Sequence, residues 1–123
     1  TKCGAVIVRP DNTVVSLGYN GFPQHIADTD ERLNNRELKY EMIIHAEMNA
    51  VLFTREPVAG CTLYVTPYPP CCRCAVHLIQ AKIAKVVAPA PAPDKLERWG
   101  ESFKLTRSLF AEAGVEYVEV VGV

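Results

Sequence analysis

The chain has 123 residues, of which 49% are hydrophobic and 22% are charged, and its formal net charge at neutral pH is −1. These values are typical of one globular domain, which we expect to span residues 1–123. The near-neutral charge argues against a long nucleic acid as partner, because binding to a phosphate backbone requires a basic surface. No apolar run reaches the length of a membrane-spanning helix, and no basic, apolar leader precedes the first predicted strand, so we expect no membrane partner.

The five cysteines indicate metal binding rather than a disulfide framework. Their number is odd, and three of them, Cys71, Cys72 and Cys74, lie within four positions, which is unsuited to a secreted disulfide scaffold. We therefore expect a reducing, cytoplasmic setting. Cys3 and Cys61 lie in or beside apolar, strand-like stretches, and we expect both to be small buried hydrophobic residues.

The first part of the chain predicts a hairpin followed by a long polar segment. Residues 3–8 and 13–19 have the composition of strands, and a turn signal at residues 10–12 separates them. Residues 22–40 lack any periodic pattern, so we expect a loop that is either functional or mobile and that is a candidate cover for a binding site. We expect His25 in this loop to be exposed.

The rest of the chain alternates between helices and strands. The hydrophobic spacing predicts a helix at 46–54, a strand at 62–66, a helix at 72–81, a strand at 83–88, a helix at 98–113 and a strand at 115–121. Pro89 to Pro93 is expected to form a short, extended spacer. Because strands joined by helical crossovers run parallel, we expect an α/β fold with one mixed five-stranded sheet and an antiparallel hairpin at one side.

Two motifs at predicted helix starts form a candidate metal site. Cys71 and Cys74 are separated by two residues at the start of a helix, where the backbone N–H groups favour thiolates. His45 at the start of another helix would complete three protein ligands. Three ligands leave one tetrahedral position for water, which is typical of a catalytic zinc site.

Glu47 supplies an acid beside this site. On a helix it projects in a different direction from His45, so we expect it to reach the metal-bound water as general base and then general acid. The alternative is a structural zinc site closed by a fourth ligand, Cys72 or His77. Cys72 is adjacent to a ligand, and we expect it to point elsewhere.

The paired motifs match the signature known for zinc-dependent deaminases, in which His-x-Glu is followed by Pro-Cys-x-x-Cys. More closely, the chain resembles the deoxycytidylate (dCMP) deaminases of the cytidine deaminase superfamily. The stretches that carry the resemblance lie along nearly the whole chain: Cys3-Gly-Ala-Val-Ile-Val8, Gly18-Tyr-Asn-Gly21, His45-Ala-Glu-Met-Asn-Ala50, Leu63-Tyr-Val-Thr66, the Cys71 to Cys74 pair, Leu78-Ile-Gln-Ala81 and Ala113-Gly-Val115.

The resemblance implies a three-layer, cytidine-deaminase-like fold with helices on both faces of the sheet. The sequence lacks the family's first helix, which would lie before Thr1. The resemblance also implies roles for individual residues. These are one catalytic Zn²⁺ bound by His45, Cys71 and Cys74, a proton shuttle at Glu47, a backbone N–H at Ala46 that holds the pyrimidine carbonyl, and a sugar contact at Asn20.

The reaction implied by the resemblance is the hydrolysis of dCMP to dUMP and ammonia, which feeds thymidylate synthesis. The resemblance further implies a homo-oligomer, a hexamer or a dimer, with dCTP and dTTP as effectors and Mg²⁺ accompanying these nucleotides. The predicted loop at 22–40 is a candidate for the effector site. The candidates for phosphate binding are Arg98, Lys104 and Arg107.

Three other functions are compatible with parts of the pattern. A cytidine or deoxycytidine nucleoside deaminase would share the zinc chemistry and lack a phosphate site. A deaminase of tRNA or single-stranded DNA is disfavoured by the near-neutral charge. A noncatalytic, zinc-containing domain that senses nucleotides is disfavoured by Glu47, because a purely structural zinc site has no use for an acid there.

Overall fold

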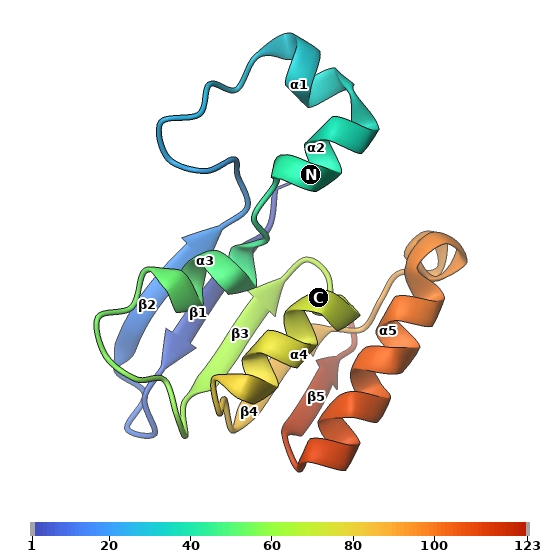
Figure 1. Cartoon of the computed structure of the whole chain (residues 1–123). Helices are drawn as coiled ribbons and strands as arrows, with labels where there is room; N and C mark the ends of the chain where they lie inside the picture. The colour runs from blue at the N-terminus through green and yellow to red at the C-terminus, as the bar shows by residue number, and fades with distance from the viewer. Residues whose placement is uncertain (1, 123) are drawn as a thin grey trace.

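A computed structural model describes residues 2–122 of the chain (Figure 1). These residues form an α/β fold whose elements follow one another in the order β1 (Gly4–Val8), β2 (Val14–Tyr19), α1 (Asp30–Asn34), α2 (Arg36–Met42), α3 (Ala46–Leu52), β3 (Thr62–Thr66), α4 (Cys72–Gln80), β4 (Lys85–Pro89), α5 (Pro93–Ala113) and β5 (Glu116–Val120).

The five strands form one mixed sheet, as the sequence predicted, and the structure gives their order as β2-β1-β3-β4-β5. β1 is antiparallel to β2 and to β3, whereas β3, β4 and β5 are parallel. Gly4 at the start of β1 pairs with Tyr19 at the end of β2 and with Thr66 at the end of β3. One edge of the sheet therefore brings together the segments that enter β1 and leave β2 and β3.

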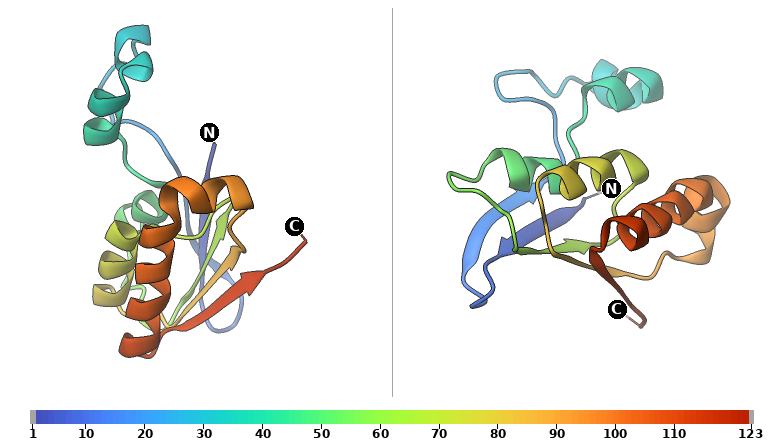
Figure 2. Two further views of the ribbon diagram at one scale, coloured as in Figure 1. Left: turned by 90° about the vertical axis from the view of Figure 1, so that its right-hand side faces the viewer. Right: turned by 60° about the horizontal axis from the view of Figure 1, so that its bottom comes forward.

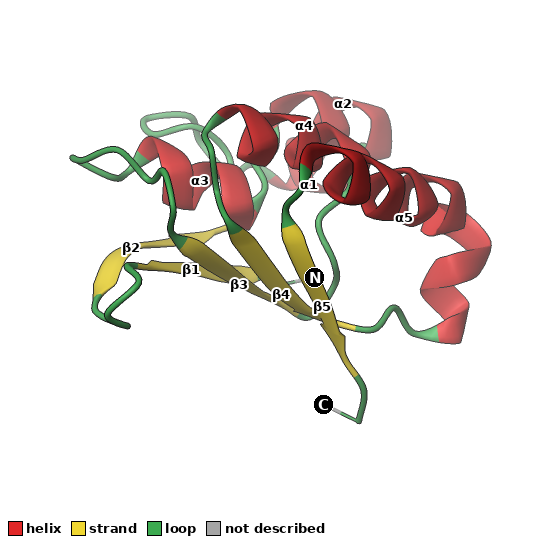
Figure 3. Ribbon diagram, turned by 90° about the horizontal axis from the view of Figure 1, so that it is seen from below, coloured by secondary structure: helices red, strands yellow, loops and turns green. Residues whose placement is uncertain are grey.

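The helices α3, α4 and α5 lie side by side over one face of the sheet (Figures 2 and 3). α4 and α5 each connect parallel strands that advance in the same direction across the sheet, and right-handed crossovers place such helices on the same side. Among residues 2–122 no helix packs on the opposite face. The expectation of helices on both faces is therefore not met within the part of the chain that the structure describes.

The core lies between the sheet and this helical layer. Alternate residues of the central strands point into it, including Ile7, Leu63 and Val86, which are fully buried. Leu78 of α4 and Phe110 of α5 pack onto them from the helical side. Among the described residues no helix is long and apolar enough to cross a bilayer.

Residues 22–40 were predicted as a loop, and this prediction is wrong where α1 and α2 form. The side chain of Thr29 accepts a hydrogen bond from the N–H of Arg32, and that of Asn35 accepts one from Leu38. Neither helix has a buried residue, so no apolar periodicity marks them in the sequence. Figure 1 shows them standing away from the sheet. We call residues 22–43 the excursion.

Several boundaries differ from the prediction. α5 begins at Pro93 rather than Arg98, because proline is well suited to the first turn of a helix. The expected spacer is correspondingly short, since Pro89 belongs to β4. Gly114 ends α5 in a left-handed conformation with φ of 80°, as expected from its position.

The two cysteines expected in the core differ in burial. Cys61 is buried, as predicted. Cys3 is only half-buried, because it lies just before β1, at the sheet edge where the site described below is located.

Candidate catalytic metal centre

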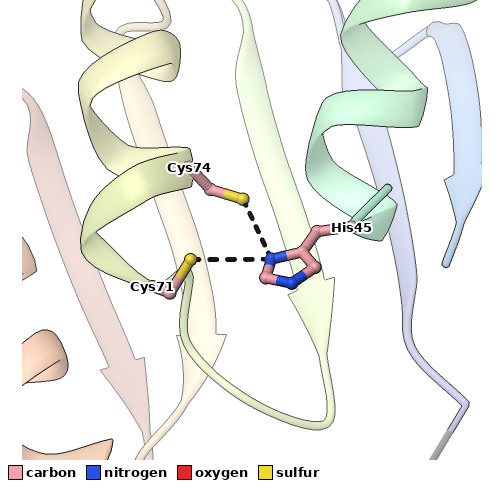
Figure 4. A group of neighbouring side chains, drawn as sticks. All are labelled: His45, Cys71 and Cys74. Carbon is pink, nitrogen blue, oxygen red and sulfur yellow. Dashed lines mark hydrogen bonds between the residues drawn. The ribbon is translucent and has the colours of Figure 1, made fainter. Parts of the chain in front are cut away.

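His45, Cys71 and Cys74 come together at the starts of two neighbouring helices (Figure 4). His45 precedes the first residue of α3, and Cys71 precedes the first residue of α4, with Cys74 one turn further. The Nδ1 atom of His45 lies 3.5 Å from Sγ of Cys71 and 3.3 Å from Sγ of Cys74. The three ligand atoms all lie within 4.8 Å of one another.

These separations fit a zinc ion. Tetrahedral coordination with Zn–S of about 2.3 Å and Zn–N of about 2.0–2.1 Å places a nitrogen ligand roughly 3.5 Å from each sulfur ligand. Among the described residues, no fourth His, Cys, Asp or Glu joins the group. Cys72 is not part of it, and Nδ1 of His77 lies 2.7 Å from the carbonyl oxygen of Arg73 instead. The donor set is thus that of an open, three-ligand site.

The charge of the cysteine pair is set by the two thiols acting on each other. A hydrogen bond from Cys74 is the main reason that the pKa of Cys71 is lowered to about 4, and His45 contributes in the same direction. The same bond with Cys71, together with burial, raises the pKa of Cys74. The interaction between the two thiols thus favours the thiolate of Cys71, which is the form that binds a metal ion.

Glu47 lies in the first turn of α3 and is only 5% exposed. Burial is the main cause that raises its pKa to about 7, because a low-dielectric environment disfavours the carboxylate. A carboxyl group with a pKa near the ambient pH can both accept and donate a proton. Glu47 is thus electrostatically suited to move protons beside the three ligands.

A cavity of about 860 Å³ opens at this edge of the sheet. Its walls come from the sheet edge, the helices α1 and α2 of the excursion, the start of α3, the segment that leads into the first turn of α4, and the first turns of α5. The lining residues that matter below are Asn20, Tyr40, Ala46, Glu47, Tyr68, Lys95, Arg98 and Trp99, together with His45 and Cys71.

Asn20 and Ala46, which the sequence proposed as substrate contacts, both line this cavity. The amide oxygen of Asn20 accepts a hydrogen bond of 2.9 Å from the N–H of Cys3, which orients the asparagine at the sheet edge. Ala46 is fully buried at the start of α3.

The candidate phosphate residues are not all at the cavity. Arg98 lines it, whereas Lys104 and Arg107 are not among the lining residues. Arg107 forms a bidentate ion pair with Glu119, with distances of 2.8 and 2.7 Å. Lys104 and Arg107 lie six and nine residues beyond Arg98, which is roughly 9 and 14 Å along a helix. This distance accounts for Arg107, whereas Lys104 directly follows the lining residue Phe103 and projects in a different direction around the helix.

Sequence reasoning missed the residues that hold the two helix starts. A Cβ atom on Gly18 would lie 2.3 Å from the carbonyl oxygen of Ala46, so β2 and α3 approach more closely than any other residue would allow. The only feature of the sequence that pointed to Gly18 was its place in the Gly18-Tyr-Asn-Gly21 stretch. From α5, Ser102 Oγ accepts from the N–H of Cys72 at 2.9 Å, and Thr106 Oγ1 donates to the carbonyl of Pro70 at 3.0 Å.

Comparisons with known proteins agree with this site. Residues 1–90 match the family model described as cytidine and deoxycytidylate deaminase zinc-binding region. An uncharacterized deaminase of Aliivibrio fischeri is 44% identical over 119 residues, covering 94% of this chain and 77% of that protein. The human deoxycytidylate deaminase is 35% identical over 127 residues, covering 95% of this chain and 66% of that protein.

A solved structure gives the same fold. The dCMP deaminase of the cyanophage S-TIM5, in complex with dCMP and dUMP, has a TM-score of 0.70 at 23% identity, covering 96% of this chain and 80% of that one. The probable deoxycytidylate deaminase of Caenorhabditis elegans is 36% identical, covering 98% of this chain and 60% of that protein. The chain thus spans somewhat less than two thirds of the length of these animal relatives.

Proposed function

The chain belongs to the cytidine and deoxycytidylate deaminase family, and from this premise we propose that it hydrolyses dCMP to dUMP and ammonia. The observation that carries the proposal is the buried Glu47, which lies beside the open three-ligand site and shares a cavity with Arg98. Glu47 and the three metal ligands support a deamination reaction, while the positive charge of Arg98 supports a nucleotide rather than a nucleoside as substrate. Deoxycytidylate deaminases among the relatives point to the same substrate.

His45, Cys71 and Cys74 would hold the ion. When bound, zinc lowers the pKa of a coordinated water to about 7 and so makes a nucleophile available at neutral pH. Glu47 accepts one proton from the attacking water and passes it to N3 of the cytosine ring, and it then transfers the second proton of that water to the amino group at C4. The C4–N bond then breaks, ammonia leaves and the carbonyl of uracil forms.

The cavity residues around the ion orient the substrate in this proposal. The backbone N–H of Ala46 donates to the pyrimidine carbonyl, and Asn20 contacts the sugar. The hydrogen bond from Cys3 to Asn20 fixes the asparagine for that contact. Arg98 contacts the phosphate, whereas Lys104 and Arg107 do not, since they lie outside the cavity lining.

Assembly and regulation follow as further parts of the proposal. We infer that residues 1–123 are one deaminase domain that functions as a homo-oligomer, a hexamer or a dimer. We infer that dCTP and dTTP act as effectors with Mg²⁺, and that the exposed excursion is the candidate effector site. A cytoplasmic location is supported by the five cysteines, which are all free of disulfide bonds.

The test is ammonia release from dCMP, deoxycytidine and CMP, with and without dCTP, with zinc content measured on the same sample. We expect rapid turnover of dCMP and slow turnover of the other two. Equal or better turnover of deoxycytidine would assign a nucleoside deaminase. A zinc-loaded protein that turns over none of them would be a noncatalytic sensor.

A further inference from the structure

We propose that Lys95 and Arg98 together form a clamp for the 5′-phosphate of the substrate, and that three aromatic side chains fix the two cations in place. The inference rests on the proposed function, because it names the residues that distinguish a nucleotide from a nucleoside in the same cavity. Neither the sequence motifs nor the metal centre pointed to Lys95. The argument comes from contacts between segments that are far apart in the chain.

Lys95 and Arg98 lie three positions apart in the first turns of α5, so their side chains share one face of the helix. Both line the cavity that contains Glu47 and the metal ligands. Neither belongs to an ion pair among residues 2–122, where the paired cations are Arg9, Lys85 and Arg107. The two α5 cations therefore line the space that the substrate would fill without a carboxylate partner, and Arg36, Lys39 and Arg73 add further positive charge around it.

Each cation is held by aromatic rings. The ammonium of Lys95 lies 4.9 Å from the ring centroid of Tyr68, in the segment that leads to Cys71. The guanidinium of Arg98 lies 5.7 Å from the ring of Tyr40 in α2 and 5.1 Å from that of Trp99. Contacts of this length are attractive because the ring faces carry negative potential. They orient the charges without neutralising them.

Tyr40 has a second contact with Arg98. Its hydroxyl accepts a hydrogen bond from Nη2 of the guanidinium, and its ring packs edge-to-face against Trp99 with centroids 6.1 Å apart. The guanidinium carries five N–H donors, so those on the other nitrogens stay available for phosphate oxygens. Tyr40 is thus a positioning residue for Arg98.

The charges match a nucleoside monophosphate. A phosphate monoester carries about −1.5 to −2 charges at neutral pH, and two cations balance this while one does not. Arginine can bind two phosphate oxygens at once, and lysine adds a point charge. A nucleoside has no group that would use either cation. The clamp therefore determines specificity and takes no part in the proton transfers at Glu47.

The experiment measures binding of the product dUMP and of deoxyuridine to the zinc-loaded full chain by calorimetry. The variants are Lys95→Met and Arg98→Met, which keep much of the apolar side chain and remove the charge. Lys104→Met is the matched control, because Lys104 is an exposed cation on the same helix outside the cavity lining. We expect the wild type to prefer dUMP, and each clamp variant to lose roughly 10- to 100-fold of that preference, the usual effect of removing a charged hydrogen bond.

Further variants test the positioning role. Tyr40→Phe keeps the ring and removes the hydroxyl, so we expect dUMP binding to weaken by only a few-fold. Tyr40→Ala removes both contacts and should approach Arg98→Met. Arg98→Lys, which keeps the charge, should recover part of the affinity. Binding of deoxyuridine and zinc content should not change in any of these variants. A loss of both would mean that Tyr40 acts on the fold, which would overturn its positioning role.

Two failures can be told apart. If the wild type releases ammonia from dCMP and prefers dUMP, yet Lys95→Met and Arg98→Met keep the full preference, the clamp is wrong and the proposed function stands. If the wild type binds dUMP no better than deoxyuridine, the clamp is wrong as well. If dUMP is preferred and the clamp variants lose this preference, but dCMP yields no ammonia, the clamp holds and the proposed reaction fails.

Discussion

The two sides of the cavity are built in different ways. The metal centre, which consists of His45, Glu47, Cys71 and Cys74, comes from the starts of α3 and α4, whose bodies are packed into the core. The cation-aromatic group, which consists of Tyr40, Tyr68, Lys95, Arg98 and Trp99, comes from three segments and is exposed or half-buried throughout.

This difference separates the residues that carry out the reaction from the residues that select the substrate. The ligands and the acid need fixed geometry, and helix starts anchored in a packed core supply it. The cations need only a favourable field and an approximate position, which aromatic contacts at the surface can supply. Changes in the metal centre should therefore abolish the reaction, while changes in the cation-aromatic group should alter the choice of substrate.

The largest expected effect is from Cys71→Ala. The variant lacks one of three ligands, so we expect it to lose bound zinc and all deaminase activity. Metal content by atomic absorption is the direct measurement. Cys72→Ala is the matched control and should keep stoichiometric zinc, because Cys72 is outside the ligand group. Retained zinc in Cys71→Ala, with loss in the control, would move the ligand assignment to Cys72.

The second-largest effect is expected from Glu47→Gln. This substitution preserves the shape of the side chain and removes its ability to accept and donate a proton. We expect turnover of dCMP to fall by a factor of about 10² to 10⁴, the usual contribution of a general acid–base group. Zinc content and the folded state should be unchanged. Ammonia release is the measurement, and substantial residual deamination would reject the shuttle role.

The metal centre could be predicted from sequence because its geometry is local. Cys71 and Cys74 are one helical turn apart, and His45 and Glu47 lie two positions apart at another helix start, so spacing alone indicates how each pair projects. Only the meeting of the two segments required the fold. The alternation of strands and helices predicted that both would lie near strand ends.

The cation-aromatic group could not be predicted in this way. Tyr40, Tyr68 and Arg98 come from segments that have no periodic relation to one another, and only tertiary structure brings them together. The helices of the excursion are marked by the caps Thr29 and Asn35 alone, since no apolar face is buried. Sequence reasoning chose Arg98 from its charge, and the same criterion also chose Lys104 and Arg107, which lie elsewhere.

A smaller effect is expected from Gly18→Ala, which tests whether the metal centre depends on its packing. The new Cβ would meet backbone atoms of Ala46 and Ala50 at 2.3 and 2.4 Å, and backbone cannot move aside as a side chain can. We expect a loss of about 1–3 kcal/mol in the free energy of unfolding, measured by urea denaturation. Gly100→Ala in α5 is the control, because nothing lies within 4 Å of its Cβ, and it should stabilise the protein by about 0.5–1 kcal/mol.

The smallest effect is expected from Arg107→Ala, which removes a cation of α5 outside the cavity. Arg107 is the main cause of the lowered pKa of Glu119, so this ion pair stabilises the fold at neutral pH, and the stabilisation is lost as the pH falls through the lowered pKa of Glu119. Because Arg107 is half-exposed, we expect a loss of only about 0.2–1 kcal/mol at pH 7, and a smaller difference from wild type at acidic pH. The KM for dCMP should not change. A rise in that KM as large as the loss of dUMP affinity expected for Arg98→Met would place Arg107 in phosphate binding. The separation between the cavity cations and the other cations of α5 would then be wrong.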